Sequence, residues 1–239
     1  ILRHAPQAQV IDLTHEIFVH WPAEAGFWLA RSYRYFPPGS VHIAVVDPGV
    51  GTSRDIIAAE FDAHVFLAPD NGLLPQVFGD RPARTHRLSP EWLAEQGWPK
   101  PSQTFHGRDI FAPLAAQIAA DRVTINQIGP PTDDLVPSLM DEPYESAGKI
   151  HGRIIAIDHF GNLITNIDAT LLPADGEGDV RAAGRQLPLR RTYGNVRPGE
   201  YLALVNSFGV VELARAEGNA AEGLGLGHGA PVIIETGDR

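Results

Sequence analysis

A change of pattern near the middle of the chain constrains its fold more than any other feature. Up to residue 130, short β-prone runs alternate with stretches whose apolar spacing is typical of amphipathic helices. Residues 149–239 hold only short β-prone runs separated by Gly, Asn and Pro, and residues 131–148 concentrate turn formers without sustained periodicity. The sequence therefore predicts an N-terminal α/β domain over residues 1–130, a linker over 131–148 and a C-terminal β domain over 149–239.

The α/β pattern predicts a mixed, mainly parallel sheet covered by helices, and the β-only pattern predicts a smaller barrel-like or sandwich domain. In the first domain we expect strands at 9–13, 42–46, 56–60 and 65–68, and helices at 23–33, 90–96 and 110–120. Ser89 is the expected N-cap of the second helix, with Pro90 at its first position. In the second domain we expect strands at 149–158, 162–166, 201–205, 210–214 and 231–234.

Charge and composition exclude several classes of function. The 29 acidic and 19 basic side chains give a formal charge of −10 with no basic run, which opposes binding to nucleic acid. No apolar stretch approaches the roughly 18 residues of a membrane helix, and no signal peptide is recognisable. The absence of cysteine excludes disulfides, thiolate nucleophiles and Cys-bearing zinc sites. We expect a soluble, cytoplasmic protein.

Two glycine-rich segments of the first domain carry ionisable side chains. Asp47-Pro48-Gly49-Val50-Gly51-Thr52-Ser53-Arg54 follows an expected strand, where ligands bind in open α/β sheets. Thr104-Phe105-His106-Gly107-Arg108-Asp109 precedes an expected helix, and Gly107 leaves space beside the imidazole. A histidine beside carboxylates and arginines is a common arrangement for moving protons near neutral pH.

Plainer interpretations stand beside this one. Asp47 could simply cap the turn that follows it, Arg54 could be a surface cation, and His106 could be a hydrogen-bonded structural residue. A metal site of Asp47, His106 and Asp109 is a further alternative, although two arginines in the same segments oppose cation binding. The phosphate-loop, zinc-helix and nucleophile-elbow motifs are absent from the sequence.

A third segment lies in the second domain, at Asp158-His159-Phe160-Gly161-Asn162-Leu163-Ile164-Thr165-Asn166. It offers an anion, a flat ring and a carboxamide, which suit an amine, a purine face and a purine edge. The alternative is a β-turn with Gly161 at a positive φ and Asn162 holding its own backbone. Phe160 and Tyr193 could equally be core aromatics.

Together, these three segments and Pro69-Asp70-Asn71-Gly72-Leu73-Leu74 resemble the S-adenosylmethionine (SAM) hydroxide adenosyltransferases, water-using relatives of the SAM-dependent fluorinase and chlorinase. The likeness extends to Asn206-Ser207-Phe208-Gly209 and Gly218-Asn219-Ala220-Ala221. It implies a homotrimer with active sites between subunits, and hydrolysis of SAM to adenosine and L-methionine. SAM is the substrate, and the resemblance implies neither a cofactor nor a metal.

The resemblance also implies a role for individual residues. Asp47, Arg54 and His106 match the catalytic Asp, Arg and His of the family. The implied substrate contacts are Asp158 to the methionine amino group, Ser207 to its carboxylate, Asn162 and the Ala220 backbone to the adenine edge, and Tyr193 with Phe160 to the adenine face. Phe105 and Gly107 complete the implied substrate-binding set.

Two further alternatives concern the reaction. Halide-using relatives carry Tyr in place of Asp47, and the fluorinase carries Tyr-Ser in place of His106-Gly107, so we expect water as the nucleophile. Family members normally begin with a strand and a Thr-Asp-Phe-Gly loop that holds the ribose, and this sequence begins at Ile1, after that loop. Either the sequence is a fragment, or ribose binding is weakened or supplied by other groups. A SAM-binding or adenosine-binding protein without turnover is a further alternative.

Overall fold

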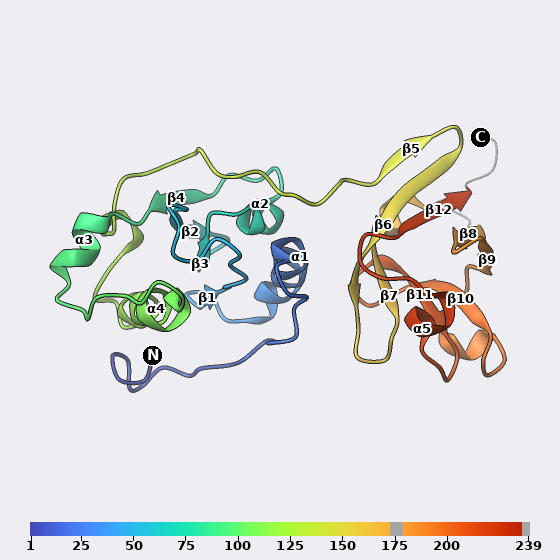
Figure 1. Cartoon of the computed structure of the whole chain (residues 1–239), viewed down its shortest axis with the longest axis horizontal. Helices are drawn as coiled ribbons and strands as arrows, with labels where there is room; N and C mark the ends of the chain where they lie inside the picture. Colours follow the sequence, from blue (N-terminus) through green and yellow to red (C-terminus); the bar gives the residue numbers. More distant parts are fainter. Residues whose placement is uncertain (173–178, 236–239) are drawn as a thin grey trace. The chain divides into compact units, whose positions relative to one another are not determined.

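The computed structural model describes residues 1–172 and 179–235, and the chain divides into two compact units, residues 1–139 and 140–239 (Figure 1). The first unit contains α1 to α4 and a small sheet, and the second is mostly β-structure. This organisation is consistent with two domains. No helix within the described residues is long and apolar enough to cross a membrane.

A four-stranded mixed sheet lies at the centre of the first unit, in the order β1-β3-β2-β4. Its strands are β1 (Val41–Ile43), β2 (Ile56–Phe61), β3 (His64–Pro69) and β4 (Arg84–Arg87). Only β1 and β3 pair in parallel, whereas β2 is antiparallel to both β3 and β4. The expectation of a mainly parallel sheet is therefore wrong for these strands.

A tight hairpin is the physical reason for this difference. Phe61 pairs with His64, so Asp62 and Ala63 alone connect β2 to β3. Both residues have positive φ, 55° and 64°, as a two-residue turn that matches the twist of its strands requires. Asp-Ala lacks the Asn-Gly signal that normally marks such a turn, and the polar sequence of β4 gives no strand signal either.

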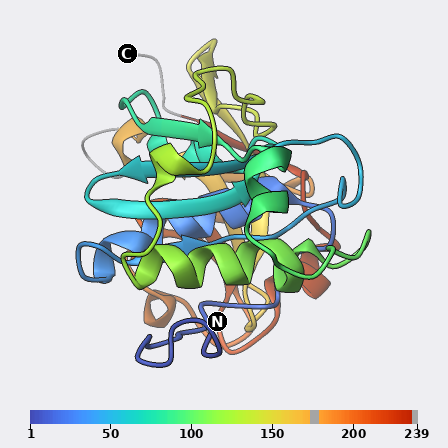
Figure 2. The same cartoon turned by 90° about the vertical axis from the view of Figure 1, so that its left-hand side faces the viewer.

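Helices cover both faces of this sheet (Figures 1 and 2). The side chains of Ile57, Ala59 and Phe61 pack in one apolar cluster with residues of α1 (Pro22–Ser32) and α2 (Leu73–Phe78). Those of Ile56 and Ala58 pack on the other face with α4 (Ala112–Ala119). The alternation of β2 between two buried faces therefore makes a three-layer α/β/α unit.

Of the other helices and strands expected in this unit, some are present, one is absent and one is shorter than expected. Residues 9–13 form no strand, and the strand expected at 42–46 ends at Ile43. The helix expected at 110–120 is α4, and a π-helical turn over Gly107–Phe111 precedes it. Helix α3 (Pro90–Glu95) is confirmed with its cap, because Ser89 Oγ accepts a hydrogen bond from Trp92 N at 3.1 Å.

An antiparallel sheet that nearly closes on itself forms the second unit, in the order β10-β11-β7-β6-β12-β8-β9, with β5 paired to β6. Its strands are β5 (Tyr144–Ser146), β6 (Lys149–Ile157), β7 (Leu163–Asp168), β8 (Asp179–Ala182), β9 (Arg185–Pro188), β10 (Tyr201–Val205), β11 (Val210–Arg215) and β12 (Pro231–Glu235). Beyond β9, Arg190 N donates to Ala203 O of β10 at 2.8 Å, which links the two end strands. The expected barrel-like β domain is thus confirmed, with one short helix, α5 (Ala220–Leu224).

Two histidines are buried in the aromatic core of the first unit. His42 on β1 and His64 on β3 are 7% and 5% exposed, and His42 Nε2 lies 3.1 Å from His64 Nδ1. The His42 ring also stacks on Phe66 with centroids 4.9 Å apart. Burial, with a smaller contribution from His64, lowers the pKa of His42 to about 4. Protonation of His42 therefore opposes folding.

We predict a loss of stability in mild acid that depends on His42. Because its pKa is about 4 when folded and about 6.5 when unfolded, the unfolded chain binds the proton first as pH falls. Folding should lose about 2 kcal/mol between pH 7 and pH 5 through this group. His42→Phe should remove that part of the pH dependence in urea unfolding, and His15→Gln, at a side chain 82% exposed, should not. The same pH dependence in His42→Phe and the parent would contradict this assignment.

Candidate active site

The Asp47–Arg54 loop follows β1 and approaches the loop before the π-helical turn. Gly51 has φ +78°, and a Cβ at this position would lie 2.2 Å from the carbonyl oxygen of Gln103. Glycine is therefore required here both by the backbone conformation and by the contact. The close approach of the two loops brings Arg54 within reach of His106.

The second loop is held by its own side chains. Asp109 Oδ2 accepts from Ser102 N at 2.8 Å, and Ser102 Oγ accepts from Phe105 N at 3.1 Å. Arg108 Nε also donates to Asp109 Oδ1 at 2.6 Å. The Arg108 guanidinium and the Ser102 hydrogen bonds hold the pKa of Asp109 well below its usual range. Asp109 therefore anchors the loop that presents His106.

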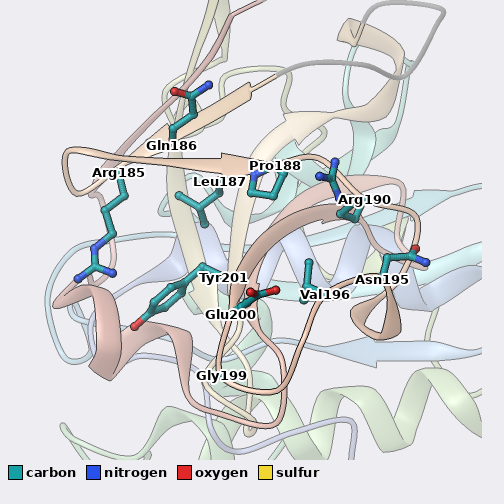
Figure 3. Close-up of a pocket in the computed structure, with 10 residues that line it drawn as sticks. All are labelled: Arg185, Gln186, Leu187, Pro188, Arg190, Asn195, Val196, Gly199, Glu200 and Tyr201. Atoms are coloured by element: carbon teal, nitrogen blue, oxygen red, sulfur yellow. The ribbon is translucent and has the colours of Figure 1, made fainter.

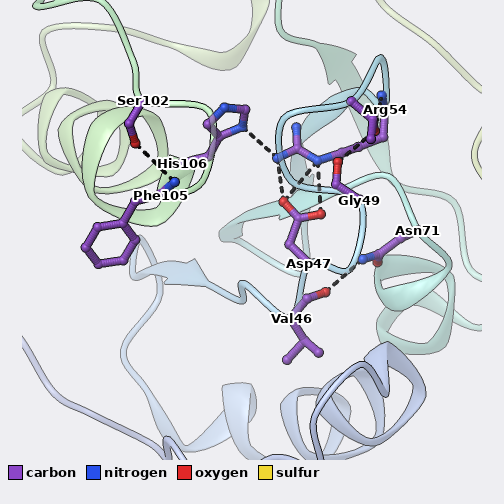
Figure 4. Close-up of polar contacts among 9 residues, drawn as sticks. Val46, Asp47, Gly49, Arg54, Asn71, Ser102, Phe105 and His106 are labelled. Atoms are coloured by element: carbon purple, nitrogen blue, oxygen red, sulfur yellow. Dashed lines mark hydrogen bonds and ion pairs between the residues drawn. The ribbon is translucent and has the colours of Figure 1, made fainter.

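Arg54 bridges the other two predicted catalytic residues (Figure 4). Its Nε donates to Asp47 Oδ1 and Oδ2 at 3.1 and 3.0 Å, and its Nη2 bonds to Oδ2 as well. The same Nη2 lies 2.8 Å from His106 Nδ1. The side chains of Asp47 and Arg54 are only 4% and 11% exposed. The three predicted residues thus form one partly buried cluster.

This geometry defines the protonation of the imidazole. A guanidinium has donors only, so His106 Nδ1 must accept from Arg54 and the ring proton must lie on Nε2. Burial lowers the pKa of His106, and the Arg54 charge lowers it further. Asp47, Asp109 and a hydrogen bond with the Ser102 main chain act in the opposite direction but are smaller. His106 is therefore neutral at physiological pH.

Asn71 supports the same cluster, although the sequence analysis gave it no role. Its Nδ2 donates to the carbonyl of Val46 at 2.8 Å, and this carbonyl belongs to the peptide that leads into Asp47 (Figure 4). The only sequence signal was the position of Asn71 in Pro69-Asp70-Asn71-Gly72. The contact ties the end of β3 to the start of the Asp47 loop.

A metal site of Asp47, His106 and Asp109 does not fit these contacts. The Asp47 carboxylate and His106 Nδ1 both face Arg54, and the Asp109 carboxylate faces Arg108. Within the described residues, no group of three histidine or carboxylate side chains gathers around a common point. Cationic partners already occupy the groups that a metal would need.

In the second unit, Asp158 and Asn162 lie together in the loop between β6 and β7. Asp158 Oδ1 accepts from Phe160 N at 2.9 Å and from Asn162 N at 2.8 Å, and its Oδ2 accepts from Asn162 Nδ2 at 2.9 Å. Gly161 has φ +82°, and a Cβ there would lie 2.2 Å from the Asn219 carboxamide. The turn with Gly161 at a positive φ, which was the alternative interpretation of this loop, is present, but Asp158 and not Asn162 holds its backbone. The ligand contacts of these side chains stay predictions.

Of the remaining residues predicted to contact the substrate, Ala220 lies beside this loop and most of the others are exposed. Ala221 N donates to Gly161 O at 2.9 Å, so the buried Ala220 at the start of α5 lies next to the loop. Phe160 and Tyr193 are 75% and 44% exposed, which excludes them as core aromatics of this unit. Ser207 is exposed in the turn between β10 and β11. In the first unit, Phe105 is also exposed, and a Cβ at Gly107 would make only distant contacts.

An open pocket of about 820 Å³ lies elsewhere in the second unit (Figure 3). Its lining includes Arg185, Arg190, Glu200 and Tyr201, and it contains none of the predicted site residues. Arg185 lies over the Tyr201 ring, 5.2 Å from its centroid. Neither its residues nor its contacts indicate a specific chemistry, so the polar clusters are the better guide to function.

Two family models match the chain. The SAM hydroxide adenosyltransferase N-terminal domain matches residues 1–129, and the SAM hydroxide adenosyltransferase C-terminal domain matches residues 152–233. A curated protein of Thermus thermophilus, named "(R)-S-adenosyl-L-methionine hydrolase", is 37% identical over 98% of this chain and 91% of its own length. A protein of the same name from Salinispora arenicola is 34% identical over 99% of this chain and 90% of its own length.

Solved structures show the same fold. An uncharacterized conserved protein from Thermotoga maritima superposes with a TM-score of 0.86 at 32% identity, over 98% of this chain and 91% of that one. A conserved hypothetical protein from Thermus thermophilus gives a TM-score of 0.77 at 35% identity, over 98% of this chain and 90% of that one. The likeness therefore covers both units of the chain.

We predict that Arg54→Met raises the pKa of His106. The substitution removes a positive charge and a donor to Nδ1, while Asp47 remains near the ring. The titration of His106, followed by NMR with ¹³C-labelled histidine, should move to higher pH. Arg81→Met removes a guanidinium that is paired with Asp62 and should leave the titration in place. A His106 pKa that is unchanged or lower in Arg54→Met would contradict the cluster described above.

Proposed function

The chain belongs to the SAM hydroxide adenosyltransferase family, and we propose that it hydrolyses S-adenosyl-L-methionine to adenosine and L-methionine. The observation that carries the proposal is the buried contact of Asp47 and His106 with the same guanidinium of Arg54. The relatives named above are hydrolases of the (R) form of SAM, and we propose the same form as the substrate here.

The reaction is a substitution at C5′ of the adenosyl group. The water oxygen forms a bond to C5′ while the C5′–S bond breaks, and the electron pair of that broken bond neutralises the sulfonium as methionine leaves. The water also loses one proton, so SAM and water give adenosine, methionine and H⁺. A sulfonium is already an excellent leaving group, and the protein mainly needs to place water in line behind C5′. The chemistry therefore requires no cofactor.

Asp47 is the group that we assign to the water. Its Oδ2 accepts two hydrogen bonds from Arg54, whereas Oδ1 accepts one and keeps a lone pair for a water O–H. A carboxylate aimed at the sulfonium would stabilise the ground state more than a transition state that is losing positive charge. Asp47 therefore orients the water and receives its proton as the C–O bond forms.

His106 acts through Arg54 in this mechanism. Its Nδ1 already accepts from the guanidinium, so this atom cannot take the proton from water while the cluster is intact. The neutral ring instead fixes the guanidinium beside Asp47. Arg54 holds the Asp47 carboxylate in place and lends positive charge to the place where hydroxide character develops. The sequence leaves both Asp47 and His106 as candidate bases, and these contacts favour Asp47.

The substrate contacts of the second unit follow the resemblance. We propose that Asp158 binds the methionine amino group and Ser207 the methionine carboxylate. Asn162 and the Ala220 backbone would bind the adenine edge, and Tyr193 and Phe160 its face. The exposure of the two rings and the proximity of Asp158 to Asn162 support these roles. Phe105 and Gly107, on either side of His106, complete the proposed site.

Assembly and location are also proposals. The family resemblance supports a homotrimer with active sites between subunits, and sedimentation of the purified protein would test it. Composition and the lack of cysteine support a cytoplasmic location. A halide-using reaction is the runner-up, and His106-Gly107 argues against it because the fluorinase has Tyr-Ser at those positions.

We predict that hydrolysis in water enriched in ¹⁸O places the label in the 5′-hydroxyl of adenosine, because water attacks carbon. The products of purified protein and SAM would be separated by chromatography and identified by mass spectrometry. Parallel reactions with chloride or fluoride should give no 5′-halo-adenosine. SAM binding without release of methionine would favour the binding protein instead, and a halogenated product would favour the halide enzyme.

We also predict that Asp47→Asn lowers kcat by about 10²–10⁴-fold with little change in SAM binding. The amide cannot take the proton of water, and its NH₂ group repels the donors of Arg54. Steady-state kinetics and calorimetry would separate the two effects. Asp55→Asn is the matched control, because Asp55 pairs with Arg87 outside the cluster at 2.9 Å. Equal turnover by Asp47→Asn and the parent would reject the role assigned to Asp47.

A further inference from the structure

A buried carboxylate in the second unit has no role in the mechanism so far. Glu212 lies on β11 and is 3% exposed. Its Oε1 accepts from the Tyr193 hydroxyl at 2.6 Å, and its Oε2 accepts from Asn206 Nδ2 at 3.1 Å. Each oxygen therefore holds a side chain from a different connecting segment, one before β10 and the other directly after it.

The hydrogen-bond partners of Glu212 are neutral groups. Among the residues that the structure describes, no lysine or arginine forms an ion pair with it. Burial raises the pKa of Glu212, the hydrogen bonds from Tyr193 and Asn206 lower it, and Asp158 raises it again. Burying a carboxylate without a cation is unfavourable for folding alone. A carboxyl group offers a separate acceptor oxygen to each of two donors, which suits a residue that holds two groups at once.

The first group that Glu212 holds is the Tyr193 ring. Tyr193 begins the 3₁₀ turn Tyr193–Asn195, and its ring is 44% exposed. Thr192 N donates to Asn195 Oδ1 at 3.1 Å, which closes the turn but does not orient the ring. The hydrogen bond of the hydroxyl to Glu212 is thus the described contact that fixes the direction of the ring.

The second group is the turn between β10 and β11. Asn206 Oδ1 accepts from Phe208 N at 3.0 Å and from Val210 N at 3.3 Å, so one carboxamide oxygen organises the turn that contains Ser207. The amide nitrogen of Asn206 donates to Glu212. Through Asn206, Glu212 connects this turn to β11.

We propose that Glu212 is a positioning residue for SAM binding, which fixes the Tyr193 ring and the Ser207 turn in one arrangement before the substrate arrives. The inference rests on the proposed function, because the adenine contact of Tyr193 and the carboxylate contact of Ser207 are part of it. Fixing both groups in advance reduces the entropy lost on binding. The residue acts on affinity, and the water-activating cluster in the first unit does not depend on it.

The test is a substitution that keeps the shape of Glu212 and removes one acceptor. In Glu212→Gln, a single oxygen can accept from Tyr193 or from Asn206, and the NH₂ group faces the donor that remains. We expect KM and Kd for SAM to rise about tenfold, equivalent to about 1.4 kcal/mol, with kcat within about twofold of the parent. KM and kcat come from methionine release, and Kd comes from calorimetry.

Two further variants separate positioning from general damage. In Glu212→Gln with Asn206→Asp, the carboxylate at 206 can accept from the new NH₂ group and still hold Phe208 N and Val210 N, so affinity should return to within about threefold of the parent. Thr165→Val removes a buried hydrogen bond from Thr165 Oγ1 to the carbonyl oxygen of Val211, which precedes Glu212 on β11. The two atoms are 2.7 Å apart in the parent. The substitution should lower the unfolding temperature without changing KM.

The outcomes distinguish this inference from the proposed function. Parent-like KM and Kd in Glu212→Gln, or a double variant as weak as the single one, would overturn the positioning role while hydrolysis stands. A parent that binds SAM without releasing methionine would overturn the proposed hydrolysis, and the Kd series would still test Glu212. A parent that does not bind SAM would overturn both.

Discussion

One guanidinium between a carboxylate and an imidazole determines the chemistry of the first unit. Arg54 has hydrogen-bond donors only, so the Asp47 carboxylate and His106 Nδ1 must both present acceptors to it. The contact is largely buried, which strengthens it and makes the loss of either partner costly. The sequence leaves His106 as a candidate general base, but in the structure its imidazole holds the Arg54 guanidinium in place.

The cluster of Asp47, Arg54 and His106 depends on close contacts made by other residues. Gly51 allows the Asp47 loop to approach Gln103, and Asn71 holds the carbonyl of Val46 directly before Asp47. Asp109 anchors the loop of His106 through Ser102. Glycine-rich segments with few apolar side chains can therefore present a defined geometry, because backbone contacts and short side chains replace packing.

The sequence predicts local features better than pairings between distant segments. The cap at Ser89 and the limits of β10 follow from local signals, as do the turn at Gly161 and the two loops that meet at Arg54. The Asp62–Ala63 hairpin reverses an expected parallel pairing, and its turn carries no recognisable motif. The sequence does not predict a role for Glu212. Its partner Tyr193 is 19 residues away, its partner Asn206 lies in the turn before β11, and its burial is visible only in the fold. The ligand contacts and the limits of the domains stay predictions.

The two polar clusters differ in their electrostatics, and this difference suits the proposed substrate. In the first unit Arg54 pairs with Asp47, whereas in the second the nearby Asp158 charge helps to raise the pKa of the buried Glu212, with no described cation beside it. A cationic ligand would relieve that repulsion. In the proposed reaction, the β unit would recognise the charge of the substrate and the α/β unit would activate the water.

The tautomer of His106 decides whether Arg54 can bridge Asp47 and His106. In protein labelled with ¹⁵N at histidine, two-dimensional NMR at pH 8 distinguishes a ring nitrogen that bears a proton from one that does not. The account predicts that His106 is neutral, with its proton on Nε2 and an unprotonated Nδ1 that accepts from Arg54. A proton on Nδ1 would contradict it, because the Arg54 bridge could not then exist and His106 would again be a candidate base.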